Sequence, residues 1–337
     1  MANPFANVVL TERLDEHCAV TAWRRLRGRS AVPDSIQILK YKRKSAVYRL
    51  NGAGPGGAPI IAKRCDQTTG LVEQMVYDEL LPHVSARSLR CYGLCPEPVG
   101  DRCWLFLEDA VGDLYSPQNP DHRALAARWL SRLHLAALPD RLKARLPNRG
   151  LTHYLQLLQK SRFILQDNLC RNSELLPEDA AVLTKILAYC DLLHGHWGTI
   201  EAIQEALPHA AVHGDFVIKN VRIQEGASEP ALLVFDWELS GWGVPGTDLA
   251  QFIGRVASPD LEVYCEGLRR QKIELGMHAI ERAAACGNLL RLVNNVNWAT
   301  MLLEFVSHDF LIKPIATLRV DEPKLARALG AFGWANA

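Results

Sequence analysis

The chain has 337 residues, enough for one large domain or two lobes, and 48% of them are hydrophobic, so a sizeable core can form. Its 38 Lys and Arg residues balance 37 Asp and Glu residues, which argues against a dedicated nucleic-acid-binding protein. No apolar run approaches the roughly 20 residues that a membrane span requires, and residues 1–17 lack the pattern of a secretory signal. We therefore expect a cytoplasmic protein with neither a membrane nor a nucleic-acid partner.

The nine cysteines are scattered along the chain without CxxC spacing. An odd number without close pairs indicates reduced thiols, because disulfide frameworks and zinc sites both require paired spacing. The densest group, Cys91, Cys95 and Cys103, is predicted to lie on strands.

Strand patterns dominate the first 110 residues. Alternating or β-branched runs predict strands at 35–42, 46–51 and 59–65, and two further strands at 89–94 and 102–109. Between these groups, apolar residues at helical spacing predict a helix over 71–84, with Leu71, Met75, Leu80 and Val84 as its apolar positions. The stretch GAGPGG (52–57) matches GxGxxG, but it lies between two predicted strands, so we interpret it as a hairpin loop rather than a dinucleotide site.

Helical patterns dominate from about residue 120. Helices are predicted over 122–138, 151–169 and 178–207, and helices resume after the segment 210–238, which predicts a strand, a loop and a hairpin. We therefore expect an α+β fold with two parts: a small antiparallel β lobe at 1–108 that binds nucleotide, and a larger helical lobe at 109–337 that carries the catalytic loop and the acceptor site.

The segment 210–238 contains three side chains that offer oxygen ligands. Asp215 and Asn220 belong to HGDFVIKN, and Asp236 follows the apolar run LLVF. Hard cations such as Mg²⁺ prefer carboxylate and amide oxygens. The pattern suggests a Mg²⁺ site at Asn220 and Asp236, with Asp215 as a base for a hydroxyl group. Each residue taken alone is equally compatible with a turn or a strand end.

Phosphoryl transfer also requires a cation at the phosphates. Lys63 lies in the predicted strand IIAKRC, and no other lysine follows before Lys143. Glu73 is the first candidate for a carboxylate that fixes this lysine, and Glu79 is the second. A solvent-facing position on an edge strand is the alternative for Lys63. The loop YKRKSA (41–46) contains no glycine, and its residues Lys42 to Ser45 either touch a nucleotide or form a solvated hairpin tip.

These motifs resemble those of the aminoglycoside phosphotransferase and choline kinase family, which shares the protein-kinase fold. HGDFVIKN resembles the H-x-D-x4-N catalytic loop of that family, and VFDWE resembles its metal-binding segment. IIAKR and EQMVYDELLP resemble its strand-three lysine and the following helix, with Glu73 at the lysine-pairing position. The resemblance extends over about residues 35–255 and implies that Asp248, in GWGVPGTDLAQF, braces the catalytic loop.

The resemblance implies a Mg-dependent phosphotransferase that moves the γ-phosphate of ATP or GTP to a hydroxyl of a small molecule, as aminoglycoside phosphotransferases do. Lys63 and Glu73 would align the nucleotide, Ser45 would contact it, and backbone groups from Glu108 to Ala110 would bind its base. Asp215 would be the catalytic base, with Asn220 and Asp236 on the metal. A choline, amino-alcohol or sugar kinase of the same fold is an alternative, and so is a non-catalytic nucleotide-binding protein.

The acceptor is left open by the C-terminal third of the sequence. A cationic aminoglycoside requires an acidic pocket, for which Glu262, Glu266, Glu304 and Asp309 are candidates, but arginines including Arg291 are interleaved with them. A quaternary ammonium favours an aromatic cage, for which the candidates are Trp237, Trp242, Trp298 and Phe305.

Overall fold

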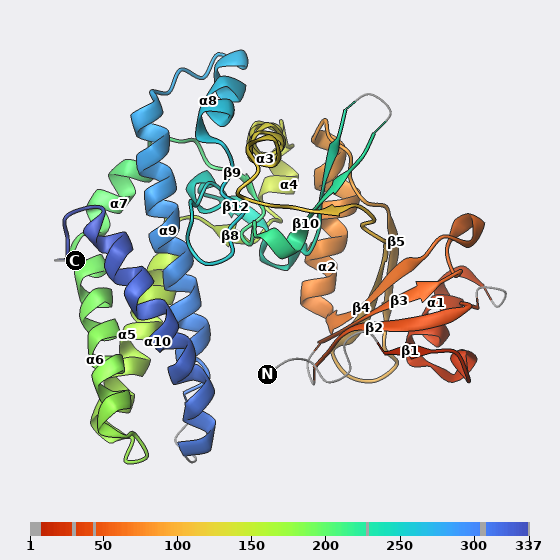
Figure 1. The fold of residues 1–337 in the computed structure, drawn as a ribbon, viewed down its shortest axis with the longest axis horizontal. Coiled ribbons are helices and arrows are strands. Elements are labelled where there is room, and N and C mark those ends of the chain that lie inside the picture. The colour runs from red at the N-terminus through yellow and green to blue at the C-terminus, as the bar shows by residue number, and fades with distance from the viewer. Residues whose placement is uncertain (1–7, 29–31, 43–44, 227–228, 304–307, 336–337) are drawn as a thin grey trace. The chain divides into compact units, whose positions relative to one another are not determined.

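The computed structural model describes residues 8–28, 32–42, 45–226, 229–303 and 308–335 (Figure 1). The chain divides into two compact units. The N-terminal unit consists of Met1–Tyr115, Ala137–Leu146 and Lys219–Ser240, and the C-terminal unit consists of Ser116–Ala136, Pro147–Ile218 and Gly241–Ala337. The segment 219–240 thus groups with the N-terminal sheet. The predicted division into a nucleotide-binding lobe at 1–108 and an acceptor-binding lobe at 109–337 remains a proposal.

The N-terminal unit is built on a six-stranded antiparallel sheet with the order β1-β2-β3-β4-β6-β5. Its strands are β1 (Val9–Leu10), β2 (Ser35–Lys42), β3 (Ser45–Asn51), β4 (Ile60–Asp66), β5 (Cys91–Pro96) and β6 (Arg102–Glu108). The five strands predicted in this part of the chain are all present, and the GAGPGG stretch connects β3 and β4 as expected. Cys91, Cys95 and Cys103 lie on β5 and β6, and all nine cysteines are free thiols.

Alternation along the strands divides this sheet into two faces. Ala62 of β4 and Phe106 of β6 face the helix α1 (Cys18–Arg27), whose Trp23 packs against Phe106 with ring centroids 5.0 Å apart. The sequence patterns did not predict α1. Lys63 follows Ala62 and therefore points to the opposite face, where the helix α2 (Gln67–Met75) lies.

Gly70 brings α2 close to that opposite face. A Cβ atom at Gly70 would overlap the Sγ atom of Cys103 and lie 2.8 Å from a methyl group of Leu94. Only glycine permits this approach, which places Glu73, one turn further along α2, beside the sheet.

The helix predicted over 71–84 is shorter and less regular in the structure. After Met75 it continues as a π-helical turn, Val76–Leu80, and then as a 3₁₀ turn, Leu81–His83. Leu71, one of the apolar positions of the predicted helix, is 50% exposed. The true α2 begins four residues earlier, so its buried face is set by Gly70 and Glu73 instead.

A three-stranded sheet completes the N-terminal unit, with the order β11-β10-β7. The strands β10 (Val221–Gln224) and β11 (Ala231–Val234) pair antiparallel with Val221 opposite Val234, and β7 (Asp113–Leu114) pairs with β10. This is the hairpin predicted around EGASEP. The short helix α4 (Asp140–Lys143) also belongs to this unit.

The C-terminal unit is mainly helical. Four long helices, α5, α6, α9 and α10, pack side by side around one apolar core (Figure 1). Its helices are α3 (Pro120–His134), α5 (Leu151–Arg171), α6 (Pro177–Gly195), α7 (Trp197–Gln204), α8 (Leu261–Arg270), α9 (Met277–Thr300) and α10 (His308–Gly330). The helix predicted over 178–207 is divided into α6 and α7, and α3 ends at His134, so Leu138 lies beyond it.

A small sheet in the C-terminal unit holds the start of the HGD segment. Its strands are β8 (Asn148–Arg149), β12 (Gly241–Gly243) and β9 (Ala210–Val212), in that order. The strand β9 is fully buried and ends one residue before His213. Among the described residues, no helix is long and apolar enough to cross a membrane.

Candidate active site

Lys63 lies at the centre of a buried ionic cluster in the N-terminal unit. Its Nζ atom is 2.5 Å from Oε1 of Glu73, forms an ion pair with Asp236, and is 3.5 Å from Oε2 of Glu238. The side chain of Lys63 is 8% exposed and that of Glu73 is completely buried. The lysine therefore does not face solvent. Glu79, the second candidate partner, binds Arg145 instead.

The burial and the charges of the cluster determine its protonation. Burial lowers the pKa of Lys63, but the carboxylates of Glu73 and Asp236 more than compensate and raise that pKa well above its ordinary value. Burial raises the pKa of Glu73 to about 7, although Lys63 opposes this shift. Burial also acts to raise the pKa of Asp236, but the nearby Lys63 ammonium holds it below its ordinary value. At neutral pH, Lys63 is a cation and Asp236 an anion.

Asp236 and Asn220 are held together at the base of the β10–β11 hairpin. The backbone N–H of Phe235 donates to the carbonyl oxygen of Asn220 at 3.1 Å, which continues the hairpin ladder by one pair. Asp236 itself has φ 69° and ψ 62°, a left-handed conformation that few residues other than glycine, asparagine and aspartate adopt. This strained backbone turns the Asp236 carboxylate toward Lys63, and such strain often occurs at functional sites.

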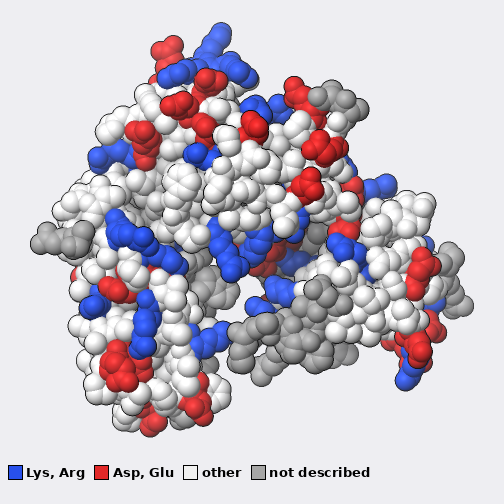
Figure 2. Space-filling view, viewed as in Figure 1, with Lys and Arg blue, Asp and Glu red and all other residues white. Residues whose placement is uncertain are grey.

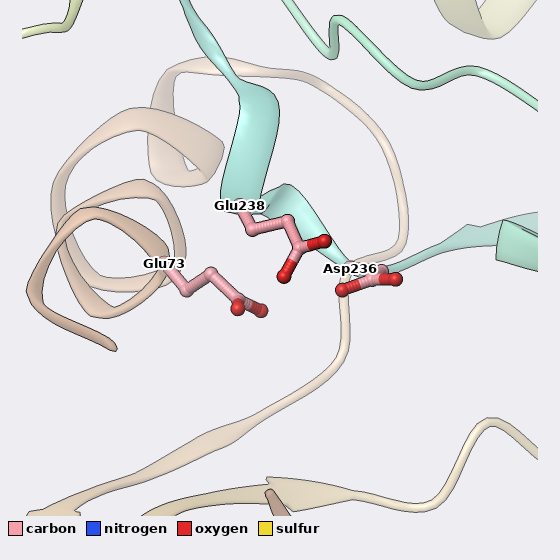
Figure 3. Close-up of side chains that lie close together, drawn as sticks. All are labelled: Glu73, Asp236 and Glu238. Atoms are coloured by element: carbon pink, nitrogen blue, oxygen red, sulfur yellow. The ribbon is translucent and has the colours of Figure 1, made fainter. Parts of the chain in front are cut away.

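The oxygen atoms of this cluster suit a divalent cation. Carboxylate oxygens of Glu73, Asp236 and Glu238 lie within 4.8 Å of one another, and Figure 3 shows the three groups directed toward one another. The Oε2 atom of Glu73 is buried and has no hydrogen-bond partner among the described residues. The donor set consists only of oxygens, which Mg²⁺ prefers. Asp236, one of the two predicted metal ligands, thus belongs to an oxygen-only cluster of a kind that Mg²⁺ prefers. The assignment of Mg²⁺ to Asn220 and Asp236 stays a prediction.

The residues predicted to contact the nucleotide lie in the same unit. Glu108 ends β6, and its backbone N–H donates to the carbonyl oxygen of Arg90. The N–H of Ala110, two residues later, donates no hydrogen bond within the described part of the chain. Asp109, between them, is fixed by Arg49 at 2.7 Å. Ser45 begins β3, where it pairs with Lys42.

Two residues of the glycine-free loop, Arg43 and Lys44, lie outside the described residues, and so do Glu304 and Phe305. Nothing structural is therefore concluded about these four positions of the predicted loop and acceptor site.

Asp215 lies in the C-terminal unit, three residues after the end of β9. The backbone N–H of Asp215 donates to Nδ1 of the buried His213 at 3.2 Å, and Gly214 has φ 76°, a conformation that favours glycine. Arg291, from α9, donates from Nη2 to Oδ1 of Asp215 at 2.9 Å and from Nη1 to the carbonyl oxygen of Gly214 at 3.2 Å. Arg291 thus holds the Asp215 carboxylate, while the side chain of Asp215 remains 23% exposed.

Asp248 braces this loop, as the resemblance implied, and that prediction is confirmed. Its carboxylate accepts the backbone N–H groups of His213 at 2.7 Å and Gly214 at 2.9 Å. His134 Nε2 lies 3.3 Å from the same carboxylate, and His134 Nδ1 lies 2.9 Å from the hydroxyl of Tyr264. His134 therefore links two helices to the loop through hydrogen bonds and is more than a packing residue.

The Asp248→Asn substitution is expected to lower the free energy of unfolding by about 1–3 kcal/mol, because one buried N–H loses its acceptor. Burial raises the pKa of Asp248, but hydrogen bonds and the nearby histidines bring it below its ordinary value. A depressed carboxylate pKa gives stability that is present above the pKa of the unfolded chain. The difference in the free energy of unfolding between wild type and variant should therefore be largest at pH 7. It should shrink as the pH falls through the pKa of Asp248 in the folded chain, which lies below about 4.

Urea unfolding at pH 7 and at acidic pH measures this effect. Asp191→Asn is a matched control, because Asp191 is 48% exposed and pairs with Arg162 at the surface, where loss of an ion pair costs less than about 1 kcal/mol. An equal loss of stability in the two variants would contradict the bracing role of Asp248.

Sequence patterns missed two residues that the structure brings to these clusters. Glu238 belongs to the quoted DWE stretch, and its position two residues after Asp236 is a local signal for a third carboxylate. Arg291 belongs to no motif. Its signal is that it is the only charged residue between residues 283 and 300, within a helix that is otherwise apolar or uncharged polar there.

The fold is shared with solved structures of kinases. The GDP and kanamycin complex of APH(2″)-IIia is 13% identical and superimposes with a TM-score of 0.61, over 90% of this chain and 97% of that chain. Choline kinase from Cryptosporidium parvum Iowa II is 12% identical, with a TM-score of 0.59 over 95% and 97% of the two chains. A microcompartment-associated aminopropanol kinase is 15% identical, with a TM-score of 0.59 over 88% and 93%.

At these identities the likeness establishes the fold alone, and it confirms the expected α+β, protein-kinase-like class. No curated protein matches the sequence at a significant level. A family model described as "Phosphotransferase enzyme family" matches residues 39–280, which is more than half of the chain and includes Lys63, Asp215 and Asp236. The expected resemblance is confirmed: the chain belongs to the phosphotransferase enzyme family and is a small-molecule kinase.

Proposed function

We propose that the chain transfers the γ-phosphoryl group of ATP or GTP, with Mg²⁺, to a hydroxyl group of a small molecule. The observation that carries this proposal is the buried ammonium of Lys63 between Glu73 and Asp236, with Asp236 joined to Asn220 through the hairpin. One compact unit thus combines a cation suited to phosphates with oxygen ligands suited to Mg²⁺. The GDP complex among the solved relatives supports a nucleotide donor.

In this proposal, residues of the N-terminal unit bind the donor. Lys63, held by Glu73, contacts the phosphates, and the N–H of Ala110 with the carbonyl group of Glu108 binds the base. Ser45 lies at the start of β3 and contributes a hydroxyl donor to the phosphates. Asn220 and Asp236 would hold Mg²⁺, which when bound neutralises charge on the β- and γ-phosphates.

Asp215 acts on the acceptor. Its carboxylate accepts the proton of the hydroxyl group while the hydroxyl oxygen forms a bond to the γ-phosphorus. The bond between that phosphorus and the bridging oxygen breaks, and the nucleoside diphosphate leaves with the electron pair. Arg291 fixes the orientation of the Asp215 carboxylate through its 2.9 Å hydrogen bond.

The test is transfer of labelled γ-phosphate from ATP or GTP to pooled hydroxyl compounds of three kinds: cationic, neutral and anionic. We expect acceptor-dependent labelling of one pool that requires Mg²⁺ and stops on chelation. Aminoglycosides and choline belong to the cationic pool, since one solved structure of the same fold is a complex with kanamycin and another is named choline kinase. Nucleotide binding without transfer to any pool would favour the non-catalytic alternative instead.

A further inference from the structure

We propose that the acceptor carries a carboxylate, which the guanidinium group of Arg291 binds next to the reacting hydroxyl. This inference rests on the proposed function, because it gives the chemical class of the molecule that Asp215 acts on. Its basis is the charge and the donor capacity of the C-terminal unit beside Asp215.

Arg291 is placed where an acceptor must lie. Its Nη2 atom is 2.9 Å from Oδ1 of Asp215, so any hydroxyl within hydrogen-bond distance of that carboxylate is close to the guanidinium group. The side chain of Arg291 is 14% exposed, which leaves part of it accessible to a ligand while most of it is out of water. A charge in this setting acts strongly on a bound ligand.

Among the described residues, the guanidinium group makes two hydrogen bonds, which leaves donors for a ligand. It carries five N–H groups in a planar fork, and the catalytic loop accepts two hydrogen bonds, at Gly214 and Asp215. The remaining N–H groups can donate to a second carboxylate in the bidentate geometry that arginine favours. Arg291 can thus bridge Asp215 and an anionic group of the acceptor.

The face of α9 that carries Arg291 is otherwise uncharged. Asn295 and Trp298 follow at spacings of four and three residues, so they share that face, and the side chain of Trp298 is 56% exposed. Asn288, one turn earlier, is occupied by two hydrogen bonds to the backbone of Gln251. This face offers amide groups and an indole ring to an acceptor, and no carboxylate.

Two of the four acids expected for a cationic acceptor, Glu262 and Glu266, lie on α8. Glu304 lies outside the described residues, and Asp309 lies in the first turn of α10. Glu262 lies in the first turn of α8, and Glu266 pairs with Arg270 at 4.0 Å on the same exposed helix. Figure 2 shows acidic and basic side chains interspersed at the end of the molecule where α8 lies in Figure 1. Among the described residues, the only ion pair of Arg291 is with Asp215. The positive charge of Arg291, beside Asp215, would repel a cationic acceptor, whereas it could form an ion pair with a carboxylate of the acceptor.

Matched acceptor sets test the inference. One set consists of glycerate, glycerol and serinol, and the other of gluconate, sorbitol and glucamine. Within each set the carbon skeleton and its hydroxyl groups are similar, and the first compound carries a carboxylate, the second is neutral and the third carries an amine. With the full chain and Mg-ATP or Mg-GTP, we expect kcat/KM for a carboxylate member to exceed that of its neutral and cationic partners at least tenfold. Preference for the polyol or the amine, or no transfer to any member despite intact nucleotide binding, would overturn the inference.

Variants of Arg291 test whether this side chain causes the preference for carboxylate acceptors. Arg291→Gln should reduce the ratio of carboxylate to polyol kcat/KM to near one, mainly through KM, and Arg291→Lys should keep part of it. Arg282→Gln is the control, because it removes a positive charge from the same helix at a side chain that packs over the ring of Phe332. An equal loss on all three acceptors in Arg291→Gln would instead indicate that Arg291 serves only to hold the Asp215 carboxylate, and the inference would fail.

A binding measurement separates failure of the inference from failure of the proposed function. Glycerate or gluconate should raise the melting temperature of the wild-type chain, more than glycerol or sorbitol, and should not do so for Arg291→Gln. Absence of any carboxylate-dependent rise in the wild type overturns the inference even where Mg-nucleotide raises the melting temperature. If Mg-nucleotide does not raise the melting temperature either, the proposed phosphotransferase function itself is contradicted.

Discussion

Replacing Asp215 with asparagine is expected to lower kcat for phosphoryl transfer by roughly 10²–10⁴-fold, the usual contribution of general acid–base catalysis. Asparagine has the same shape and can still accept the hydrogen bond from Arg291, so the loop should keep its structure, but it cannot accept the proton of the hydroxyl group. Mg-nucleotide binding should change little, because no nucleotide role is assigned to Asp215. Initial rates of nucleoside diphosphate release and melting with Mg-nucleotide measure the two effects.

Asp260→Asn is a suitable control for this experiment. Asp260 caps α8 through hydrogen bonds from the N–H groups of Glu262 and Val263, and asparagine is an equally good cap. The variant removes one negative charge from the same unit without changing the catalytic loop. A kcat of Asp215→Asn within a few-fold of the control would remove Asp215 from the role of base.

Asp236→Asn is expected to abolish the Mg²⁺-dependent part of nucleotide binding. A nucleotide at a hundredfold excess over its dissociation constant stabilises the folded chain by about 2.7 kcal/mol, and the part of this stabilisation that requires Mg²⁺ should be lost in the variant. Asparagine tolerates the left-handed backbone of Asp236, whereas alanine adds strain, so asparagine isolates the effect of the charge. The measurement is thermal melting with ATP or GTP, with and without Mg²⁺.

The comparison must use the shift caused by Mg²⁺ and not the absolute melting temperature. Removing the charge of Asp236 leaves Lys63 with Glu73 and the more distant Glu238, so the nucleotide-free variant should itself melt lower. Asp101→Asn, at a side chain that is 88% exposed, controls for loss of a carboxylate in the same unit. A full Mg²⁺-dependent shift in Asp236→Asn would exclude Asp236 as a metal ligand.

Much of the fold could be predicted because its strands and long helices carry strong local patterns. The strand β2 was predicted with the bounds Ser35–Lys42 that the structure has, since its alternation is regular. The helix α1 was missed because it is only ten residues long and three of these are arginines, and its burial depends on Trp23 meeting the sheet. The π-helical turn after Met75 likewise has no sequence signature, because it reflects how α2 packs and not what it contains.

The candidate site was predictable where its residues are close in sequence. Asp215, Asn220 and Asp236 lie within one strand-rich segment, and the pairing of Lys63 with Glu73 follows from one strand and the next helix. Arg291 lies 76 residues after Asp215, on a helix whose docking depends on the whole C-terminal core. Its isolated charge marks Arg291 within the helix, but no sequence pattern places it beside Asp215. The left-handed backbone of Asp236 is equally invisible in the sequence, because aspartate adopts that conformation in few settings.

The close approach at Gly70 has a genetic consequence. Because any side chain at this position collides with Cys103 and Leu94, a substitution there would push α2 away from β4 and separate Glu73 from Lys63. Gly70 would therefore score as an essential residue in a loss-of-function screen although it carries no chemistry. Second-site suppressors of Gly70→Ala would arise at Cys103 or Leu94, as smaller residues that restore the space, and not among the charged residues of the cluster.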